Sequence, residues 1–414
     1  MLYKRGSYLL TCYKTIFSSF HFFHNDNYLI VLLVHHCMAM RIPVNKPSIT
    51  QKEIDYVTDA VTNCWGDSCY DYIIKFTERL KECFKVKHAW TTSSCHGALH
   101  TVLMALGVGP GDEVIVPDIT WIGTASPAVW LGAKPVFVDV QEDSWCIDPD
   151  MIRKNITSKT KAIIPVHLYG SVCDMDEIIA VGKEYNIPVV EDAAEAVGAL
   201  YKGKPVGSIG DFGVISLHGT KTFTSGEGGA ILSNRDDLEF KVSTICNQGR
   251  RPDKHIMFWV DEIGLKYKMS NLDAALGLAQ FERFDELVDK KRLIFKWYQD
   301  RLGNVPDTTM NYEKPGNKNV YWMPSIVLGD SYSFTEEERE KLIRILNDQG
   351  IGFRPFFFPV SMYPMFENKE SNVVSYKLYK KGINLPSYHD MTEEEVDEVC
   401  NALMEFINSA RTDQ

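Results

Sequence analysis

The chain has 414 residues, of which 45% are hydrophobic and 24% are charged. These values are typical of a globular protein with a large core and roughly two or three domains. The formal net charge of −11 argues against broad binding to nucleic acid or to an anionic membrane. Ten cysteines are scattered without a CxxC pair. This pattern predicts neither a zinc site nor a disulfide framework, and it favours the reducing cytoplasm.

Residues 1–39 differ in composition from the rest of the chain. They are rich in aromatic side chains, and their apolar run, 28–34, is too short to span a bilayer. Polar residues at 25–27 stand where a signal peptide would carry basic ones. We expect an N-terminal extension that is disordered or arises from an upstream start codon, with Met38 or Met40 as the true start.

Strands and helices alternate through the first two thirds of the organised sequence. Helical patterns at 48–64 and 70–84 precede a turn that leads into a helix over 97–106. Apolar strand patterns follow at 113–117, 135–140, 161–167 and 187–192, with a helix over 175–185 before the last. This alternation predicts an α/β domain with a mostly parallel sheet, in which ligands bind beyond the carboxyl ends of the strands.

The pattern changes towards the C-terminus. Residues 234–300 are mainly helical, broken by a polar loop at 248–253. Beyond residue 315 the sequence predicts strands over 320–328 and 352–359 and helices over 335–349 and 393–409. We therefore predict a large domain over 40–295 and a small α+β domain over 296–414.

Lys221 lies in a loop rich in Ser, Thr and Gly, directly after the apolar run 212–217. A lysine between two buried strands is costly unless its amine is neutralised, for example as a Schiff base with an aldehyde cofactor. A solvated lysine in a hairpin loop explains the same pattern. Lys221 alone leaves both interpretations open.

Three other features match the remaining parts of a pyridoxal phosphate (PLP) site. Asp192 ends a buried strand, where a carboxylate could protonate a pyridine nitrogen or merely cap a helix. Trp121 could stack on the cofactor ring or pack in the core. Residues 93–96 could bind a phosphate at a helix start or only cap that helix. Together with Lys221, these features favour a PLP site.

Five stretches resemble the DegT/DnrJ/EryC1/StrS family of sugar aminotransferases. They are Pro-Gly-Asp-Glu-Val-Ile-Val-Pro (110–117), Pro-Val-His-Leu-Tyr-Gly (165–170), Glu-Asp-Ala-Ala-Glu-Ala (191–196), the Lys221 stretch with Gly-Glu-Gly-Gly, and Tyr-Lys-Met-Ser-Asn-Leu-Asp-Ala-Ala-Leu-Gly (267–277). The resemblance implies a fold-type I PLP-dependent transferase, like aspartate aminotransferase. Residues 221–229 and 350–357 are most similar to the perosamine and viosamine synthases of this family.

The resemblance also implies roles for individual residues. Lys221 would be the Schiff-base lysine and Asp192 the partner of the pyridine nitrogen, and both would be catalytic. No metal is implied, and Asn271 would reach the phosphate in the partner subunit of a homodimer with shared active sites. The other implied positions are Trp121 on the ring, Glu195 near the ring hydroxyl, Ser94, Cys95, His96 and Ser216 at the phosphate, and Arg354, His167 and His389 at the substrate.

Two positions depart from the family pattern. The phosphate turn usually reads Ser-Gly-Thr, whereas Cys95 and His96 follow Ser94 here. The backbone donors of the turn survive this change, but a threonine hydroxyl contact does not. The family often carries Pro-x-His after the arginine, whereas Ser361 occupies that histidine position here.

The predicted reaction moves the amino group of L-glutamate to the C4 keto group of a nucleotide-linked 4-keto-6-deoxy-hexose, as in the biosynthesis of deoxyamino sugars for polysaccharides. A 3-aminotransferase of the same family and a non-catalytic PLP-binding regulator are the alternatives. Loss of the lysine or of the aspartate would favour a regulator, and both are present. Some relatives carry histidine at the lysine position and act as dehydratases, which Lys221 argues against.

Overall fold

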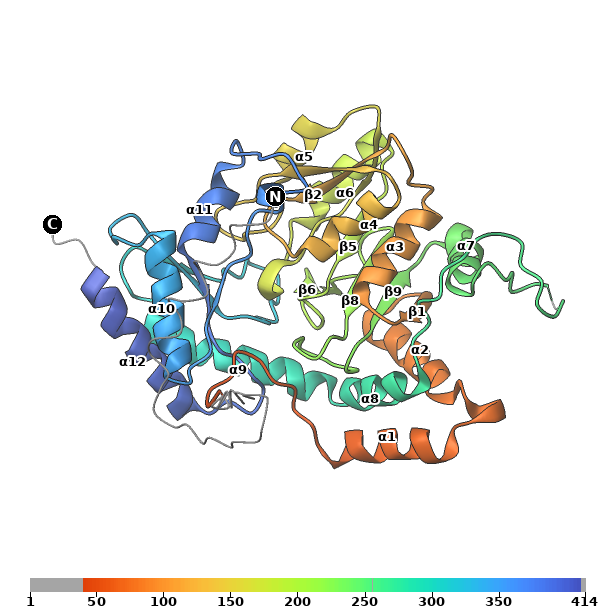
Figure 1. Ribbon diagram of the computed structural model, residues 1–414, viewed down its shortest axis with the longest axis horizontal. Helices are drawn as coiled ribbons and strands as arrows, with labels where there is room; N and C mark the ends of the chain where they lie inside the picture. The colour runs from red at the N-terminus through yellow and green to blue at the C-terminus, as the bar shows by residue number, and fades with distance from the viewer. Residues whose placement is uncertain (1–39, 255, 411–414) are drawn as a thin grey trace, which may run out of the picture. The chain divides into compact units, whose positions relative to one another are not determined.

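The computed structural model describes residues 40–254 and 256–410 (Figure 1). The extension predicted for residues 1–39 lies outside the described residues. Among the residues that are described, no helix is both long and apolar enough to cross a membrane.

The centre of the fold is a mostly parallel sheet in two sections. One section has the order β1 (His88–Thr92), β9 (Gly229–Ser233), β8 (Phe212–Ser216), β5 (Val190–Asp192), and the other has the order β3 (Lys134–Val138), β2 (Glu113–Pro117), β4 (Thr160–Ile163). Parallel bridges from Ile163 to Val189 and from Val166 to Asp192 join the sections. Strand β9 pairs antiparallel with both of its neighbours. The predicted α/β class is therefore confirmed.

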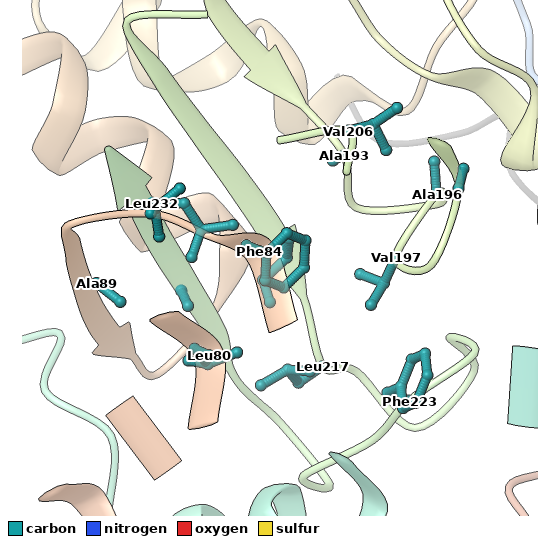
Figure 2. Close-up of a cluster of buried hydrophobic side chains, with 14 of the residues drawn as sticks. Leu80, Phe84, Ala89, Ala193, Ala196, Val197, Val206, Leu217, Phe223 and Leu232 are labelled. Atoms are coloured by element: carbon teal, nitrogen blue, oxygen red, sulfur yellow. The ribbon is translucent and has the colours of Figure 1, made fainter. Parts of the chain in front are cut away.

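Both faces of this sheet are buried, which explains the uninterrupted apolar character of its strands. Along β9, Leu232 belongs to a core cluster with helix α2 (Asp71–Phe84), shown in Figure 2. The adjacent Ile231 belongs to a second cluster with helices α3 (Cys95–Ala105) and α7 (Asp236–Cys246). Successive side chains of a strand point to opposite faces, so one short strand contributes to two cores.

The C-terminal part has its own antiparallel sheet, in the order β10 (Thr308–Met310), β11 (Ser325–Leu328), β13 (Gly382–Asn384), β12 (Arg354–Pro355). Helices α10 (Glu336–Asp348) and α12 (Glu393–Ala410) cover it around a third core cluster. Helix α9 (Phe284–Leu302) contributes Leu287 to the first cluster and Ile294 to this one. The predicted limit between 295 and 296 falls inside α9, and the two-domain division stays a prediction.

The remaining elements connect these layers. They are α1 (Gln51–Asn63), η2 (Gly66–Ser68), η3 (Ile122–Thr124), α4 (Ser126–Trp130), α5 (Pro149–Asn155), η4 (Leu168–Gly170), α6 (Met175–Tyr185), β6 (Leu200–Tyr201), β7 (Lys204–Pro205), α8 (Asn271–Phe281), η5 (Val360–Met362) and α11 (Val373–Lys381).

Several predicted elements are shorter than expected, and others were missed. The strand predicted over 352–359 is reduced to β12, and Pro359 beyond it has no N–H to donate to a ladder. The strand predicted over 320–328 begins only at Ser325, since Tyr321 has a positive φ of 52°. The elements that were not predicted include the strands β1, β10 and β13 and the helices α4, α5 and α11.

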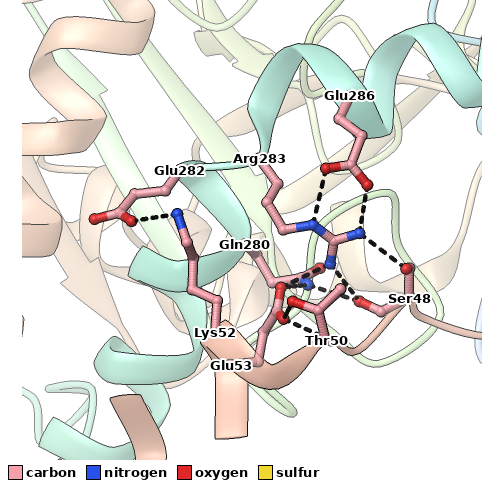
Figure 3. A network of polar contacts seen from close by, with 8 residues as sticks. All are labelled: Ser48, Thr50, Lys52, Glu53, Gln280, Glu282, Arg283 and Glu286. Atoms are coloured by element: carbon pink, nitrogen blue, oxygen red, sulfur yellow. Dashed lines mark hydrogen bonds and ion pairs between the residues drawn. The ribbon is translucent and has the colours of Figure 1, made fainter. Parts of the chain in front are cut away.

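A buried polar network connects α1 to Gln280 of α8 and to Arg283 at the start of α9, as Figure 3 shows. Glu53, only 1% exposed, accepts hydrogen bonds from Arg283 Nη1 at 2.8 Å and from Gln280 Nε2 at 2.7 Å. Glu53 also forms a capping box with Thr50. Although burial opposes ionisation, the hydrogen bonds from Thr50 and Arg283 lower the pKa of Glu53 to about 2.

Candidate active site

The predicted cofactor residues gather at the carboxyl ends of neighbouring strands. Asp192 ends β5 and Ser216 ends β8, which are parallel neighbours. The loop after β8 carries Lys221 and returns through Gly228 to β9. In a parallel sheet this edge is the usual place for a ligand.

The amine of Lys221 faces a carboxylate and an aromatic ring. Its Nζ donates to Glu195 Oε1 at 3.2 Å and lies 3.8 Å from the ring centroid of Trp322. The Lys221 side chain is 15% exposed, and that of Glu195 is 5% exposed. The lysine is therefore held inside the protein and is not a solvated loop residue.

Asp192 is buried, and its carboxylate is bonded only to neutral donors among the described residues. Its carboxylate accepts from Thr124 Oγ1 at 2.8 Å and from the backbone N–H of Ala194 at 3.1 Å. Burial raises the pKa of Asp192, against the opposing effects of these two donors and of the Lys221 charge. A cationic donor at this carboxylate would favour its ionised form.

Glu195 connects Lys221 to the protein interior. Its second oxygen accepts from the backbone N–H of Tyr169 at 2.8 Å. Burial raises the pKa of Glu195, while the Lys221 charge and these hydrogen bonds lower it. Tyr169 is fully buried in a left-handed conformation, with φ 54°. Such strain in a bulky residue persists only where its surroundings hold it firmly.

The turn predicted to bind phosphate is the start of α3. Ser94 is the N-cap, and its Oγ accepts from Gly97 N at 3.0 Å. The N–H groups of Cys95 and His96 have no acceptor within the helix, because they lie in its first turn. Gly229 of β9 packs against this turn so closely that an added Cβ would lie 2.5 Å from Cys95 N. The turn thus combines capping by Ser94 with free backbone donors.

The side chain of His96 contacts other side chains, and this arrangement does not suit a phosphate contact. Its Nε2 lies 2.7 Å from Ser126 Oγ, and its ring stacks on Trp130 at 4.5 Å. Ser216 Oγ accepts from His218 N at 3.4 Å. Of the predicted phosphate residues, His96 therefore contributes at most its backbone.

Trp121 is 57% exposed, which is unusual for a tryptophan beside a buried site. Its ring lies 6.0 Å from Phe357 of the C-terminal part, and Phe357 stacks at 5.3 Å on Tyr169. An aromatic face is thus open next to the Asp192–Lys221 region, as a stacking platform requires.

Asn271 is the first residue of α8, and Ser270 is the N-cap of that helix. The Asn271 Oδ1 accepts from Tyr72 N at 3.0 Å and so caps α2. Its buried Nδ2 has no hydrogen-bond partner among the described residues. The amide oxygen of Asn271 therefore has a structural role, and its amide nitrogen has no partner within the described chain.

The three predicted substrate residues have different surroundings. Arg354 is exposed on β12, and its side chain forms no ion pair with another described residue. His167 is fully buried, and its Nδ1 accepts from Cys173 N at 3.2 Å, so that Nε2 donates to Glu191 at 3.2 Å. His389 is 3% exposed beside the buried amine of Lys291. In this arrangement neither histidine presents a ring nitrogen to solvent.

Ser361, which departs from the family pattern, is also buried. Its Oγ donates to Asp118 Oδ2 at 2.8 Å, and its backbone N donates to the other oxygen at 2.9 Å. Asn372 Nδ2 completes the set at 2.8 Å. This side chain therefore fixes the segment after β12 to the end of β2.

The sequence did not single out Tyr169, Trp322 or Thr124, which contact the predicted residues directly. Aromatic and β-branched side chains at buried positions do not differ in pattern from ordinary core residues. Their contacts depend on long-range folding, which a single sequence does not reveal.

Comparison with known proteins identifies the family of the chain. The profile of the DegT/DnrJ/EryC1/StrS aminotransferase family matches residues 47–404. The chain belongs to this family. It is a PLP-dependent sugar aminotransferase, and the predicted cofactor is thereby confirmed.

Individual relatives support this assignment. The chain is 40% identical to a GDP-perosamine synthase of Escherichia coli O157:H7, over 88% of this chain and 98% of that protein. It is 38% identical to a GDP-perosamine synthase of Caulobacter vibrioides, over 88% and 97% of the two chains. The structure of Spr1654 from Streptococcus pneumoniae, described as a sugar aminotransferase in its PLP form, matches with a TM-score of 0.81 at 28% identity, covering 90% and 100%. The predicted fold-type I architecture is therefore confirmed.

The residues of this aminotransferase fit PLP. Asp192 is a buried carboxylate that lacks a cationic hydrogen-bond donor, and a protonated pyridine nitrogen would supply one. The free N–H groups at Cys95 and His96 suit a phosphate. Trp121 leaves a ring face open, and Lys221 provides the only amine that lies against Glu195 in the described residues.

Proposed function

We propose that this enzyme transfers the amino group of L-glutamate to the C4 keto group of a nucleotide-linked 4-keto-6-deoxy-hexose, as a perosamine-type synthase. The products would be 2-oxoglutarate and the 4-amino-4,6-dideoxy sugar nucleotide. The pairing of Lys221 with Glu195 beside the buried Asp192 supports the aminotransfer. The relatives named GDP-perosamine synthases support the choice of substrate.

In this proposal PLP, when bound, withdraws electrons from the carbon that bears the amino group and so makes its proton removable. Asp192 holds the proton on the pyridine nitrogen through its buried negative charge. Lys221 Nζ, once the amine is free, would take the proton from the substrate carbon that bears the amino group and return it at the cofactor, and would do the reverse with the sugar. Glu195 keeps Lys221 in position, and Trp121 restricts the ring to one plane.

The phosphate would be bound by backbone N–H groups of Cys95 and His96, with the hydroxyls of Ser94 and Ser216. Asn271 of the partner subunit would complete this site through its Nδ2, which has no acceptor in the described residues of its own chain. For the sugar nucleotide we propose Arg354 alone among the three predicted residues. Arg354 is an exposed residue without an ion-pair partner among the described residues, although partial burial of its guanidinium lowers its pKa, whereas His167 and His389 are buried.

A substrate panel tests the reaction. The purified enzyme with PLP and L-glutamate is incubated separately with GDP-, UDP- and dTDP-linked 4-keto-6-deoxy sugars and with a 3-keto isomer. We expect mass spectrometry to detect an amino sugar from a 4-keto substrate, with one 2-oxoglutarate formed per amine. An amine formed only from the 3-keto sugar would contradict C4 transfer. No amine from any sugar, with PLP bound, would contradict sugar aminotransfer.

Subunit mixing tests the shared site. A Lys221→Ala protein and an Asn271→Glu protein, each inactive, are mixed under conditions where subunits exchange. If sites are shared, one site of each heterodimer contains an intact Lys221 and an intact Asn271 from different chains, and activity returns. Mixtures that exchange subunits and remain inactive would overturn the shared site. Ser270→Ala, which removes the neighbouring helix cap, is the control for helix loss alone.

A further inference from the structure

We propose that Trp322 is a positioning residue, whose indole face holds the Lys221 amine at the point where the proton is transferred. The inference rests on the proposed role of Lys221. It extends that role to a side chain from the C-terminal part of the chain, which neither the motifs nor the spacing of the sequence singled out.

The contact has the geometry of a cation–π interaction. Lys221 Nζ lies 3.8 Å from the Trp322 ring centroid, well within the usual limit of about 6 Å. Trp322 is 3% exposed, so water does not screen this contact effectively. Glu195 Oε1 binds the same amine at 3.2 Å. The ammonium group is therefore held by a ring face and a carboxylate together.

The backbone of Trp322 is fixed on several sides. Its carbonyl accepts from Ser387 Oγ at 2.9 Å and from the buried Lys291 Nζ at 3.3 Å. The preceding residue, Tyr321, has a φ of 52°. Gly170 packs so closely that a Cβ there would lie 2.6 Å from Trp322 N. A side chain presented by a strained and crowded turn has little freedom to move.

The indole also forms a hydrogen bond with the loop that carries Lys221. Its Nε1 donates to the carbonyl of Thr220 at 2.7 Å, and Asn45 Nδ2 donates to the same oxygen. Trp322 therefore positions both the backbone before Lys221 and the amine at the end of its side chain. A buried indole N–H usually has an acceptor, but an ordinary core tryptophan does not also hold an amine against its ring face.

The charged and titratable groups that act on the Lys221 amine are Glu195, in direct contact, and Asp192 and Cys95, which interact with its charge. The ring differs from them because it carries no net charge. Its face and the Glu195 carboxylate together hold the amine in place. Removal of the ring should therefore leave the amine freer to move and to react.

The test measures the reactivity of Lys221 in the cofactor-free protein. Wild type, Trp322→Phe and Trp322→Leu are labelled with trinitrobenzenesulfonate, and the Lys221 peptide is quantified by mass spectrometry. The exposed Lys204 serves as the internal reference. All proteins are labelled at pH 8. This pH lies above the pKa of Lys291, which burial lowers to about 7. We expect the leucine variant to react about threefold to tenfold faster at pH 8, and the phenylalanine variant to lie between it and wild type.

Tetrafluorotryptophan at position 322 separates this effect from simple access, because it keeps the shape of the ring and weakens the negative potential of its face. If the cation–π contact holds the amine, labelling of this protein should also rise. Labelling that rises in the leucine variant but not with tetrafluorotryptophan would mean that the ring only blocks the reagent, and would overturn the proposal. Equal labelling of all the proteins would do so too.

Because the tetrafluorotryptophan protein keeps the packing of the indole, its labelling decides the proposal even if Trp322→Leu does not fold. The outcome does not depend on the sugar, since no substrate is present. Failure of the substrate panel with a positive labelling result would overturn the proposed function and leave the Trp322 contact standing.

Discussion

Asp192 and Glu53 are both buried carboxylates, yet the protein treats them in opposite ways. Glu53 is bonded to the Arg283 guanidinium and to its own helix cap, and these bonds lower its pKa to about 2. Within the part of the chain that the structure describes, the Asp192 carboxylate accepts only from a hydroxyl and one backbone N–H, and burial raises its pKa. A carboxylate whose charge is satisfied within the chain stabilises the fold. One that lacks a cationic donor is poised to bind a ligand that brings one.

A raised pKa alone does not identify such a site. Burial also raises the pKa of Asp118, which accepts three hydrogen bonds from the segment after β12 and has a structural role. Asp192 differs because Lys221 and the exposed ring of Trp121 lie in the same region. This combination of groups distinguishes Asp192 from Asp118.

The largest expected effect is that of Lys221→Ala. Because Lys221 supplies the amine that binds the cofactor and moves the proton, its loss should lower aminotransfer by roughly three or more orders of magnitude. The thermal unfolding midpoint should change little. Borohydride treatment of the wild-type PLP form should attach the cofactor to the Lys221 peptide. Attachment of the cofactor to Lys202 or Lys204 instead would show that Lys221 is not the lysine that binds the cofactor.

Asp192→Asn and Glu53→Gln form a matched pair, since each replaces a buried carboxylate by its amide. For Asp192→Asn we expect kcat to fall by about two orders of magnitude, or about 3 kcal/mol of transition-state stabilisation, with a fold as stable as wild type. Steady-state kinetics and urea unfolding measure the two quantities. Near-normal turnover would reduce Asp192 to a structural residue.

For Glu53→Gln we expect the reverse, a stability loss with kcat unchanged in the folded enzyme. The fall in pKa from 4.5 to about 2 corresponds to about 3 kcal/mol. Because folding lowers this pKa, the contribution is present above pH 4.5 and is lost as the pH falls towards about 2. Urea unfolding at pH 7 should therefore separate variant and wild type more than unfolding near pH 3. An equal difference at both values would exclude the charge as the cause.

The smallest expected effect is that of Thr124→Val, which keeps the shape and removes one donor to Asp192. A single hydrogen bond to a charged group is worth about 1.5 kcal/mol, so kcat should fall about tenfold. Thr120→Val is the matched control, because its hydroxyl meets Thr124 and is not bonded to Asp192 in the structure. A larger loss in the control would indicate that the loop, and not the donor, matters.

The sequence predicted the parts of this molecule whose signals are local. The parallel strands are apolar runs, and Asp192 and Lys221 were predicted from their position at or just after strand ends, whereas Ser216 was predicted from the family resemblance alone. Trp322 and Tyr169 could not be predicted, because their importance comes from left-handed turns that meet across the fold. The short β12 was overestimated, because its aromatic pattern outweighed the proline beyond it, which has no N–H to donate to a ladder.

Helix α9 has a consequence for how the enzyme unfolds. Leu287 and Val288 belong to the core beside the main sheet, whereas Ile294, Tyr298 and Leu302 belong to the core of the C-terminal sheet. If either core opened completely, so that the amide protons in it exchanged with solvent, α9 would fray and disturb the other core as well. Hydrogen exchange should therefore show a single slowest-exchanging unit across both parts, with α9 among its last members to open.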